Sequence, residues 1–214
     1  MPSELSATAG PFLTRLAREA IESALAGRRP PAFDAPQVVK RLGLWAGGRP
    51  PRLEELGLEV VNEPGAAFVT LTQRGELRGC IGSLEAERPL GLDVQLNAID
   101  AACGDPRFAP LRVEELSRTD IEVSVLSKAK PLKFSGRDDL LTKLRPEVDG
   151  LILQAAGRRG TFLPQVWEQL PTPEMFLSQL VRKAGLPAGY WGSDVRIWRY
   201  TVTAFEEDRE ANGP

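Results

Sequence analysis

Hydrophobic residues recur every three or four positions in three segments of the chain, which is typical of helices that pack on a core. Residues 11–26 form one apolar face. Residues 90–103 form two apolar stripes, which predicts a helix that is packed on both sides. Thr172 and Pro173 supply an N-cap and a first turn, and they predict the start of a third helix.

Other segments have the alternating pattern or the composition of β-strands. Residues 66–72 and 76–82 predict a hairpin with a three-residue loop that ends at Gly75, where a positive φ favours glycine. This register predicts two opposite faces, with Val69, Leu71, Leu77 and Gly79 on one and Thr70, Arg78 and Cys80 on the other.

Three further strand regions follow along the chain. Residues 119–126 alternate cleanly, with Ile121 expected to point inward and Glu122 outward. A second hairpin is predicted around residues 157–160. Residues 195–205, rich in β-branched and aromatic side chains, predict one long final strand.

The order of these elements predicts the fold class. Helices lie between groups of strands and there is no regular β-α-β alternation, so we expect an α+β fold with a mixed, mostly antiparallel sheet flanked by helices. The 214 residues fit one large domain or two closely joined lobes. We expect residues 10–207 to form a single domain and residues 1–9 and 208–214 to be frayed tails.

Composition narrows the chemistry. The chain has no histidine, so within one chain it cannot form a Ser-His-Asp or Cys-His catalytic site or an imidazole zinc site. The net charge of −2 gives no electrostatic reason to expect nucleic acid as a partner. No apolar run is long enough to cross a membrane, and the N-terminus has no signal-peptide pattern. We therefore expect a cytoplasmic protein with two free thiols, Cys80 and Cys103, and no motif identifies a cofactor.

Residues 78–82 carry the most specific pattern. Gly79 and Gly82 weaken a strand unless a bulge, a ligand or another backbone comes close, so we consider both as ligand-binding candidates. On the predicted face, Arg78 would stabilise the thiolate of Cys80, which favours a reactive cysteine. The alternative is that Cys80 is a small packing residue, and the same alternative holds for Cys103 in its helix.

Other candidates lie in separate segments. Asp105 and Arg107 belong to a stiff Asp-Pro-Arg-Phe turn, where Arg107 could bind an anion or simply pair with Asp105. Glu122 could act as a base, although a solvated sheet face explains it equally well. Thr161 adds a hydroxyl at a strand-to-helix junction that could contact an anion. We predict no metal site.

Five segments in this order resemble one protein family. They are residues 68–72, Leu-Arg-Gly-Cys-Ile-Gly at 77–82, Asp-Pro-Arg-Phe at 105–108, residues 121–126 and Gly-Thr-Phe-Leu-Pro-Gln-Val-Trp at 160–167. The chain resembles the AMMECR domain family, whose prokaryotic members are called AmmeMemoRadiSam system protein A, from about Phe12 to Phe205. The resemblance implies a larger lobe made from both chain ends, a smaller middle lobe, and a cleft near Leu77–Gly82.

The resemblance leaves the biochemical activity open but implies partners. The family name associates these proteins with a Memo-like protein and a radical S-adenosylmethionine protein. One hypothesis is an enzyme or enzyme subunit in which Cys80 is the nucleophile, Glu122 moves protons, and Arg78 and Arg107 bind an anionic group. The other is a non-catalytic binding or adaptor module that docks on a partner protein.

Overall fold

The computed structural model describes residues 5, 8–28, 33–43 and 51–208, which divide into two compact units. Unit 1 comprises residues up to 126 and from 203 onward, and unit 2 comprises residues 127–202. Each unit has its own hydrophobic core. Within the described residues, no helix combines the length and the apolar character needed to span a membrane.

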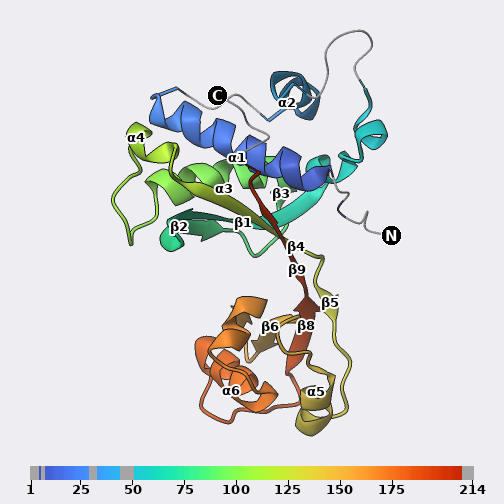
Figure 1. Ribbon diagram of the computed structural model, residues 1–214. Helices are drawn as coiled ribbons and strands as arrows, with labels where there is room; N and C mark the ends of the chain where they lie inside the picture. The colour runs from blue at the N-terminus through green and yellow to red at the C-terminus, as the bar shows by residue number, and fades with distance from the viewer. Residues whose placement is uncertain (1–4, 6–7, 29–32, 44–50, 209–214) are drawn as a thin grey trace. The chain divides into compact units, whose positions relative to one another are not determined.

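Unit 1 is a sheet with helices on one face (Figure 1). Its strands run in the order β2-β1-β4-β9, and β3 pairs with one end of β1. The strands are β1 (Pro64–Gln73), β2 (Glu76–Gly82), β3 (Arg88–Pro89), β4 (Asp120–Leu126) and β9 (Val202–Glu206). The helices are α1 (Ala9–Leu25), α2 (Ala35–Arg41), α3 (Leu90–Cys103) and α4 (Val113–Leu116), with 3-10 turns at Leu53–Leu56 and Glu59–Asn62.

Strand alternation explains why this sheet has one buried and one polar face. Val69 and Leu71 of β1 and Ile121 and Val123 of β4 point into the core that α1 and α3 cover. Because successive side chains of a strand point to opposite faces, the polar residues between them lie on the other side. The predicted inward side chain of Ile121 and outward side chain of Glu122 agree with this arrangement.

The first hairpin differs from its predicted register in two details. Its turn has two residues, Arg74 and Gly75, both with positive φ (54° and 83°), because Gln73 still pairs with Glu76. Leu71 pairs with Gly79 and Thr72 with Leu77, so Arg78 is a bulge residue. The predicted inward face of Leu77 is therefore wrong, and 43% of Leu77 is exposed.

Unit 2 is a second antiparallel sheet with its own helices. Its strands, in spatial order, are β5 (Lys130–Pro131), β8 (Arg196–Tyr200), β6 (Gly150–Ala155) and β7 (Arg158–Phe162). Its helices are α5 (Arg137–Lys143) and α6 (Pro173–Lys183), with a 3-10 helix η3 at Pro164–Glu168. In the core the ring of Trp167 stacks on Phe176 with centroids 3.9 Å apart, and Thr172 caps α6 as predicted.

Two boundary predictions in this half of the chain are wrong. The long final strand is broken at Thr201, with β8 in the sheet of unit 2 and β9 in that of unit 1. The break is fixed because the Thr201 N–H donates to Ser127 Oγ (2.9 Å) and the Ser127 N–H donates to the Thr201 carbonyl (2.8 Å). The second hairpin turns at Ala156-Gly157, so Arg158 lies in β7 and not in a loop.

The fold class predicted from the sequence is confirmed. The protein is α+β, and β1 pairs antiparallel with β2, β3 and β4, as β8 does with β5 and β6. Helices flank both sheets. Unit 1 positions the predicted site, because the 78–82 segment forms its edge strand β2.

Candidate functional site

Three polar side chains form a row across the polar face of the unit 1 sheet. Thr70 of β1 is opposite Cys80 of β2 on one side and opposite Glu122 of β4 on the other. Directly opposed residues of adjacent strands share a face, so the thiol, the hydroxyl and the carboxylate lie side by side. All three residues are half-buried. The two predicted catalytic residues are therefore brought onto one surface, with Thr70 between them.

Hydrogen bonds connect this row. The Thr70 hydroxyl donates to Cys80 Sγ at 3.4 Å. The Ser124 hydroxyl, one row further along the same face, donates to Glu122 Oε1 at 2.9 Å. A hydroxyl donor stabilises a thiolate or carboxylate more than the neutral acid. Thr70, which the sequence alone did not identify as a site residue, is thus part of the candidate site.

Asp105 and Arg107 hold the backbone of Cys80 from outside the sheet. The Cys80 N–H donates to Asp105 Oδ2 at 2.9 Å, and Arg107 Nη2 donates to the Cys80 carbonyl at 3.0 Å. The same guanidinium pairs with Asp105, 2.7 Å from Nη2 to Oδ2 and 3.0 Å from Nε to Oδ1. We call Asp105 with Arg107 the Cys80 clip. It satisfies backbone groups that an edge strand leaves unpaired.

The two members of the Cys80 clip differ in exposure. The Asp105 side chain is 2% exposed, whereas that of Arg107 is 53% exposed. The hydrogen bonds from the Arg107 guanidinium, with those from the Cys80 and Arg107 N–H groups, hold the pKa of Asp105 far below its usual value despite burial. Asp105 is therefore an anchored anion. The Arg107 guanidinium is the cation that lies beside Cys80.

Gly79 and Gly82 have packing roles in the structure. A Cβ on Gly79 would lie 2.1 Å from the carbonyl oxygen of Ala101 in α3, and a Cβ on Gly82 would lie 2.2 Å from the ring of Phe68. Both glycines therefore permit a close approach, as glycine within a strand often does. Ligand binding by either glycine stays a prediction.

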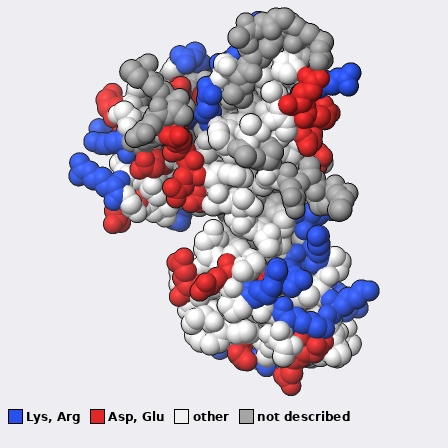
Figure 2. All heavy atoms as spheres, turned by 45° about the vertical axis from the view of Figure 1, so that its right-hand side comes forward, with Lys and Arg blue, Asp and Glu red and all other residues white. Residues whose placement is uncertain are grey.

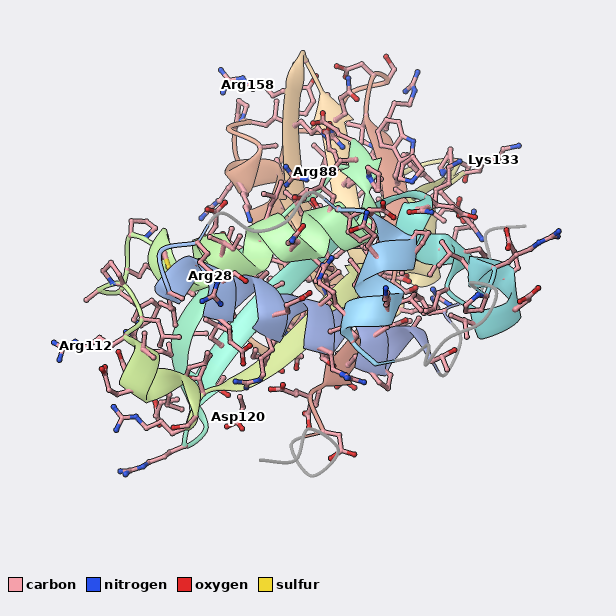
Figure 3. The ribbon with its side chains drawn as sticks, turned by 90° about the horizontal axis from the view of Figure 1, so that it is seen from above. Arg28, Arg88, Arg112, Asp120, Lys133 and Arg158 are labelled. Carbon is pink, nitrogen blue, oxygen red and sulfur yellow. The ribbon has the colours of Figure 1, made fainter. Side chains whose placement is uncertain are left out.

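Arg78 is engaged away from Cys80. Its Nε and Nη2 each lie 3.2 Å from a carboxylate oxygen of Glu115, and Nη1 donates to the Ala109 carbonyl at 2.9 Å. Arg78, followed by the Arg112 N–H, lowers the pKa of Glu115 to about 2. Arg112, labelled in Figure 3, is exposed at the start of α4. The predicted guanidinium beside the thiol is thus supplied by Arg107, because the bulge gives Arg78 different neighbours.

A buried polar network at the other end of β2 was missed from the sequence. The Ala67 N–H donates to Asp93 Oδ2 at 2.9 Å, and Asn97 Nδ2 donates to the Ala67 carbonyl at 3.0 Å. Ser83 and Arg88 donate to Asp93 Oδ1 at 2.7 and 2.8 Å. We call Asp93 with Asn97 the Ala67 clip. The available signal was a pair of polar residues four positions apart on one side of a mostly apolar helix.

The remaining candidates lie apart from the row. Thr161 belongs to unit 2, where its hydroxyl donates to the Leu151 carbonyl at 2.9 Å. Cys103 is exposed at the end of α3, so its predicted packing role is wrong. Desolvation, and then the charge of Asp100, raise the pKa of the Cys103 thiol. Within the described residues, no group of three or more histidine, cysteine, aspartate or glutamate side chains could hold a metal ion.

Comparisons with known proteins cover nearly the whole chain. A family model described as AMMECR1 matches residues 14–205. The chain is similar to a protein of Methanothermobacter thermautotrophicus, at 37% identity over 95% of this chain and 97% of the relative. It is also similar to a protein of Aeropyrum pernix, at 36% identity over 100% of this chain and 84% of the relative. The crystal structure of the uncharacterized protein PH0010 from Pyrococcus horikoshii matches with a TM-score of 0.71 and 31% identity, covering 93% of this chain and 91% of that one.

Proposed function

The chain belongs to the AMMECR1 family, and on that premise we propose that it is an enzyme or enzyme subunit with Cys80 as its nucleophile. The supporting observation is the cross-strand row, in which Thr70 stands between the Cys80 thiol and the Glu122 carboxylate. A nucleophile needs a neighbouring group that stabilises its charged form and another that moves protons. The row offers both on one polar sheet face.

Each residue has a role that follows from its contacts. The Thr70 hydroxyl donates to Cys80 Sγ and so stabilises the thiolate. The half-exposed Arg107 guanidinium, held in place by Asp105, attracts an anionic group of the substrate. Glu122 lies two strands from Cys80, about 10 Å between backbones at the usual strand spacing. It therefore acts on a substrate or water molecule seated over Thr70 rather than on the thiol.

The proposed covalent step is the attack of the thiolate on an acyl carbon. A C–S bond forms, the bond to the leaving group breaks, and the leaving group departs with that electron pair and takes a proton from solvent. Water then attacks the thioester carbonyl while Glu122 accepts a proton from this water, the C–S bond breaks to release the thiolate and a carboxylic acid, and Glu122 gives its proton to solvent.

We further propose that the protein acts with the Memo-like and radical S-adenosylmethionine proteins that the family resemblance implies. Mixing purified partners from one organism with this chain, followed by size-exclusion chromatography, tests the proposal directly. Co-elution that survives the Cys80→Ala change would show a complex independent of the thiol. Separate elution of every partner would remove this part of the proposal and leave the thiol chemistry to be judged alone.

The rate of Cys80 alkylation by iodoacetamide tests the proposed nucleophile. Mass spectrometry would follow Cys80 and Cys103 in the same folded sample from pH 5 to pH 10. We expect Cys80 to react at lower pH than Cys103, whose thiol pKa is raised. A Cys80 thiol that stays inert until the protein unfolds would overturn the proposal and favour the adaptor module.

A matched variant identifies the source of the reactivity. Thr70→Val removes the hydroxyl that donates to Cys80 but keeps a β-branched side chain of similar shape. We expect slower Cys80 alkylation and unchanged Cys103 alkylation. Thr72→Val, on the same face of β1 but opposite Leu77, is the control and should change neither rate. Equal effects of both variants would show that the Thr70 contact does not activate the thiol.

A further inference from the structure

The net charge of the chain conceals an unequal distribution between its units. Unit 2 has 12 lysine and arginine residues against 7 aspartate and glutamate residues, whereas unit 1 has 15 against 22. Unit 2 is therefore basic, at +5, within a chain of net charge −2. Figure 2 shows lysine and arginine side chains gathered on one face of unit 2. The net charge of the whole chain gave no reason to expect nucleic acid as a partner, but that value does not describe unit 2.

An open pocket of about 470 Å³ lies at the β5–β8 edge of this basic unit. Residues 131–136 form one wall, and residues 191–193 and 195–198 form the other. Three aromatic rings line it. Phe134 and Trp191 contact each other with centroids 5.6 Å apart, and Trp198 extends from β8 opposite Pro131. All three rings are only partly buried, so their remaining surface is available to a planar ligand.

The charged residues in the pocket lining are both cations. Lys133 and Arg196 are exposed, and no aspartate or glutamate occurs among the lining residues. Lys133 is labelled in Figure 3. Arg196 Nη1 donates to the carbonyls of Ser193 and Val195 at 2.9 and 3.0 Å, which fixes the guanidinium at the pocket.

Hydrogen bonds hold both walls in place. The Leu132 N–H donates to the Ile197 carbonyl at 2.8 Å, which joins the first wall to β8. Asp194, beside the second wall, accepts from the Ala156 N–H at 2.6 Å and from the Tyr190 hydroxyl at 2.9 Å. The Ala156 N–H and the Tyr190 hydroxyl, with a smaller contribution from the charge of Arg196, lower the pKa of Asp194, so this carboxylate offsets part of the Arg196 charge. The pocket is preformed, and a preformed site loses little entropy on binding.

We propose that this pocket binds a nucleotide, with its base against the aromatic rings and its phosphate at Lys133 and Arg196. Base-to-aromatic stacking together with cations for phosphate is the combination that proteins use for unpaired nucleotides. A pocket of this volume is within the range that accommodates small ligands. The nucleotide can be free or can belong to a single-stranded nucleic acid, because base and phosphate are common to both. This site is independent of the chemistry proposed at Cys80.

Intrinsic tryptophan fluorescence provides the readout, because Trp191 and Trp198 line the pocket. The full chain would be titrated at low salt with AMP, adenosine, inorganic phosphate and a short oligo-deoxyadenylate. Saturable quenching by AMP, at least about fivefold tighter than by adenosine, is expected from the added phosphate charge. Binding by the oligonucleotide but not by AMP would also support the site and would assign it to a strand. No saturable binding of either up to about 1 mM would overturn the proposal.

Charge-reversal variants localise the binding. Lys133→Glu should weaken AMP binding by about tenfold, because it places a carboxylate beside the phosphate. Arg182→Glu is the matched control, since Arg182 is exposed on α6 of the same unit and does not line the pocket. It should change affinity by less than about twofold. Equal weakening by both variants would show attraction to the charge of the unit and would overturn a defined site.

A ring-removing variant tests the stacking component. Phe134→Leu retains an apolar side chain but removes one aromatic face, so AMP affinity should fall while phosphate affinity stays constant. Circular dichroism and a thermal melt confirm that the variant is folded. A folded Phe134→Leu protein that binds AMP as the wild type does would refute the role of the rings.

Discussion

The Ala67 clip and the Cys80 clip both hydrogen-bond the backbone N–H and carbonyl of one strand residue, but they differ in their exposure to solvent. In each, an aspartate accepts the N–H of a strand residue at 2.9 Å, and a side-chain nitrogen donates to the carbonyl of that residue at 3.0 Å. Asp93 is 0% exposed and Asn97 3% exposed. In the Cys80 clip the donor is a half-exposed guanidinium beside a half-buried thiol.

This difference in exposure distinguishes the Ala67 clip, which has a structural role, from the Cys80 clip, which also lies beside a thiol at the surface. The Asp93 and Asn97 side chains of the Ala67 clip are buried, so they hold the strands together without themselves reaching solvent, and the adjacent Arg88 is only partly exposed (38%). A clip with an exposed cation holds its strand and also presents positive charge at the surface next to Cys80. We therefore expect changes in the Ala67 clip to alter stability alone, and changes in the Cys80 clip to alter stability and thiol reactivity.

The largest expected effect comes from the buried clip. Asp93→Ala leaves the Ala67 N–H and the Arg88 guanidinium without their carboxylate, and should lower the free energy of unfolding by about 3–5 kcal/mol. Urea denaturation measures this change. Asp100→Ala, at an exposed position of the same helix, is the control and should cost less than about 0.5 kcal/mol. Similar losses for both variants would mean that the buried network contributes little.

Removing the carboxylate of the Cys80 clip should have a smaller effect on stability and an additional effect on reactivity. Asp105→Ala leaves the Cys80 N–H unsatisfied but leaves Arg107 free to reach solvent, so we expect a loss of about 2–3 kcal/mol. Alkylation of Cys80 in the folded state should also change, whereas Asp93→Ala should leave it unaltered. A stability loss without any change in Cys80 alkylation would make both clips purely structural.

Acid should weaken unit 1 through Asp105 and Glu115. The pKa of each carboxyl is below its usual value in the folded protein, so each stabilises the fold while it stays ionised. That contribution is complete above the ordinary carboxyl range of about pH 4. It declines as the pH falls toward 2, the folded value for Glu115. We expect Glu115 alone to contribute roughly 2 kcal/mol.

Unfolding measured between pH 5 and pH 2 would test this dependence. Glu115→Gln should reduce stability at pH 5 and flatten its decline, because glutamine has no proton to gain. Glu54, exposed in the 3-10 turn at Leu53–Leu56, provides the matched glutamate for a control substitution. If stability falls with pH as steeply in Glu115→Gln as in the wild type, the ion pair between Glu115 and Arg78 is not the cause of the acid dependence.

The smallest effect on stability is expected at Arg107, where substitution also tests most directly whether the Cys80 clip differs from the Ala67 clip. Arg107→Gln should cost less than about 1 kcal/mol, because the guanidinium is half exposed. Cys80 alkylation near neutral pH should slow by about fivefold, equivalent to about 1 kcal/mol of charge interaction. Arg107→Lys keeps the charge and should recover most of the rate. If the rate of Cys80 alkylation does not differ between Arg107→Gln and Arg107→Lys, the charge at this position does not affect the thiol, and Arg107 only supports the backbone.

Much of the fold could be predicted from local pattern. Helix α3 has the predicted bounds, and the alternation in β4 correctly assigned Ile121 inward and Glu122 outward. These predictions succeeded because periodicity reports which face of an element is buried. The break at Thr201 could not be found in this way, because a strand that changes sheets keeps a continuous β-type composition.

The candidate site was only partly predictable for a similar reason. Cys80 and Glu122 could be placed on a polar strand face from alternation alone. The ion pair between Arg78 and Glu115 could not be predicted in this way, because the bulge at Arg78 shifts the register of β2 and so changes which residues lie beside it. Asp93 and Asn97 were overlooked because most other positions of their helix are apolar and predict a packed core.

By itself the sequence determined the α+β class, the family and the strand that carries Cys80, because these depend on local periodicity and on a specific string of residues. Only the tertiary structure decided which groups meet. It placed Thr70 between Cys80 and Glu122, gave Arg107 rather than Arg78 to the Cys80 backbone, and gathered the rings of Phe134, Trp191 and Trp198 at one edge. These contacts join residues far apart in the chain, and their register and packing are set by three-dimensional structure rather than by local pattern.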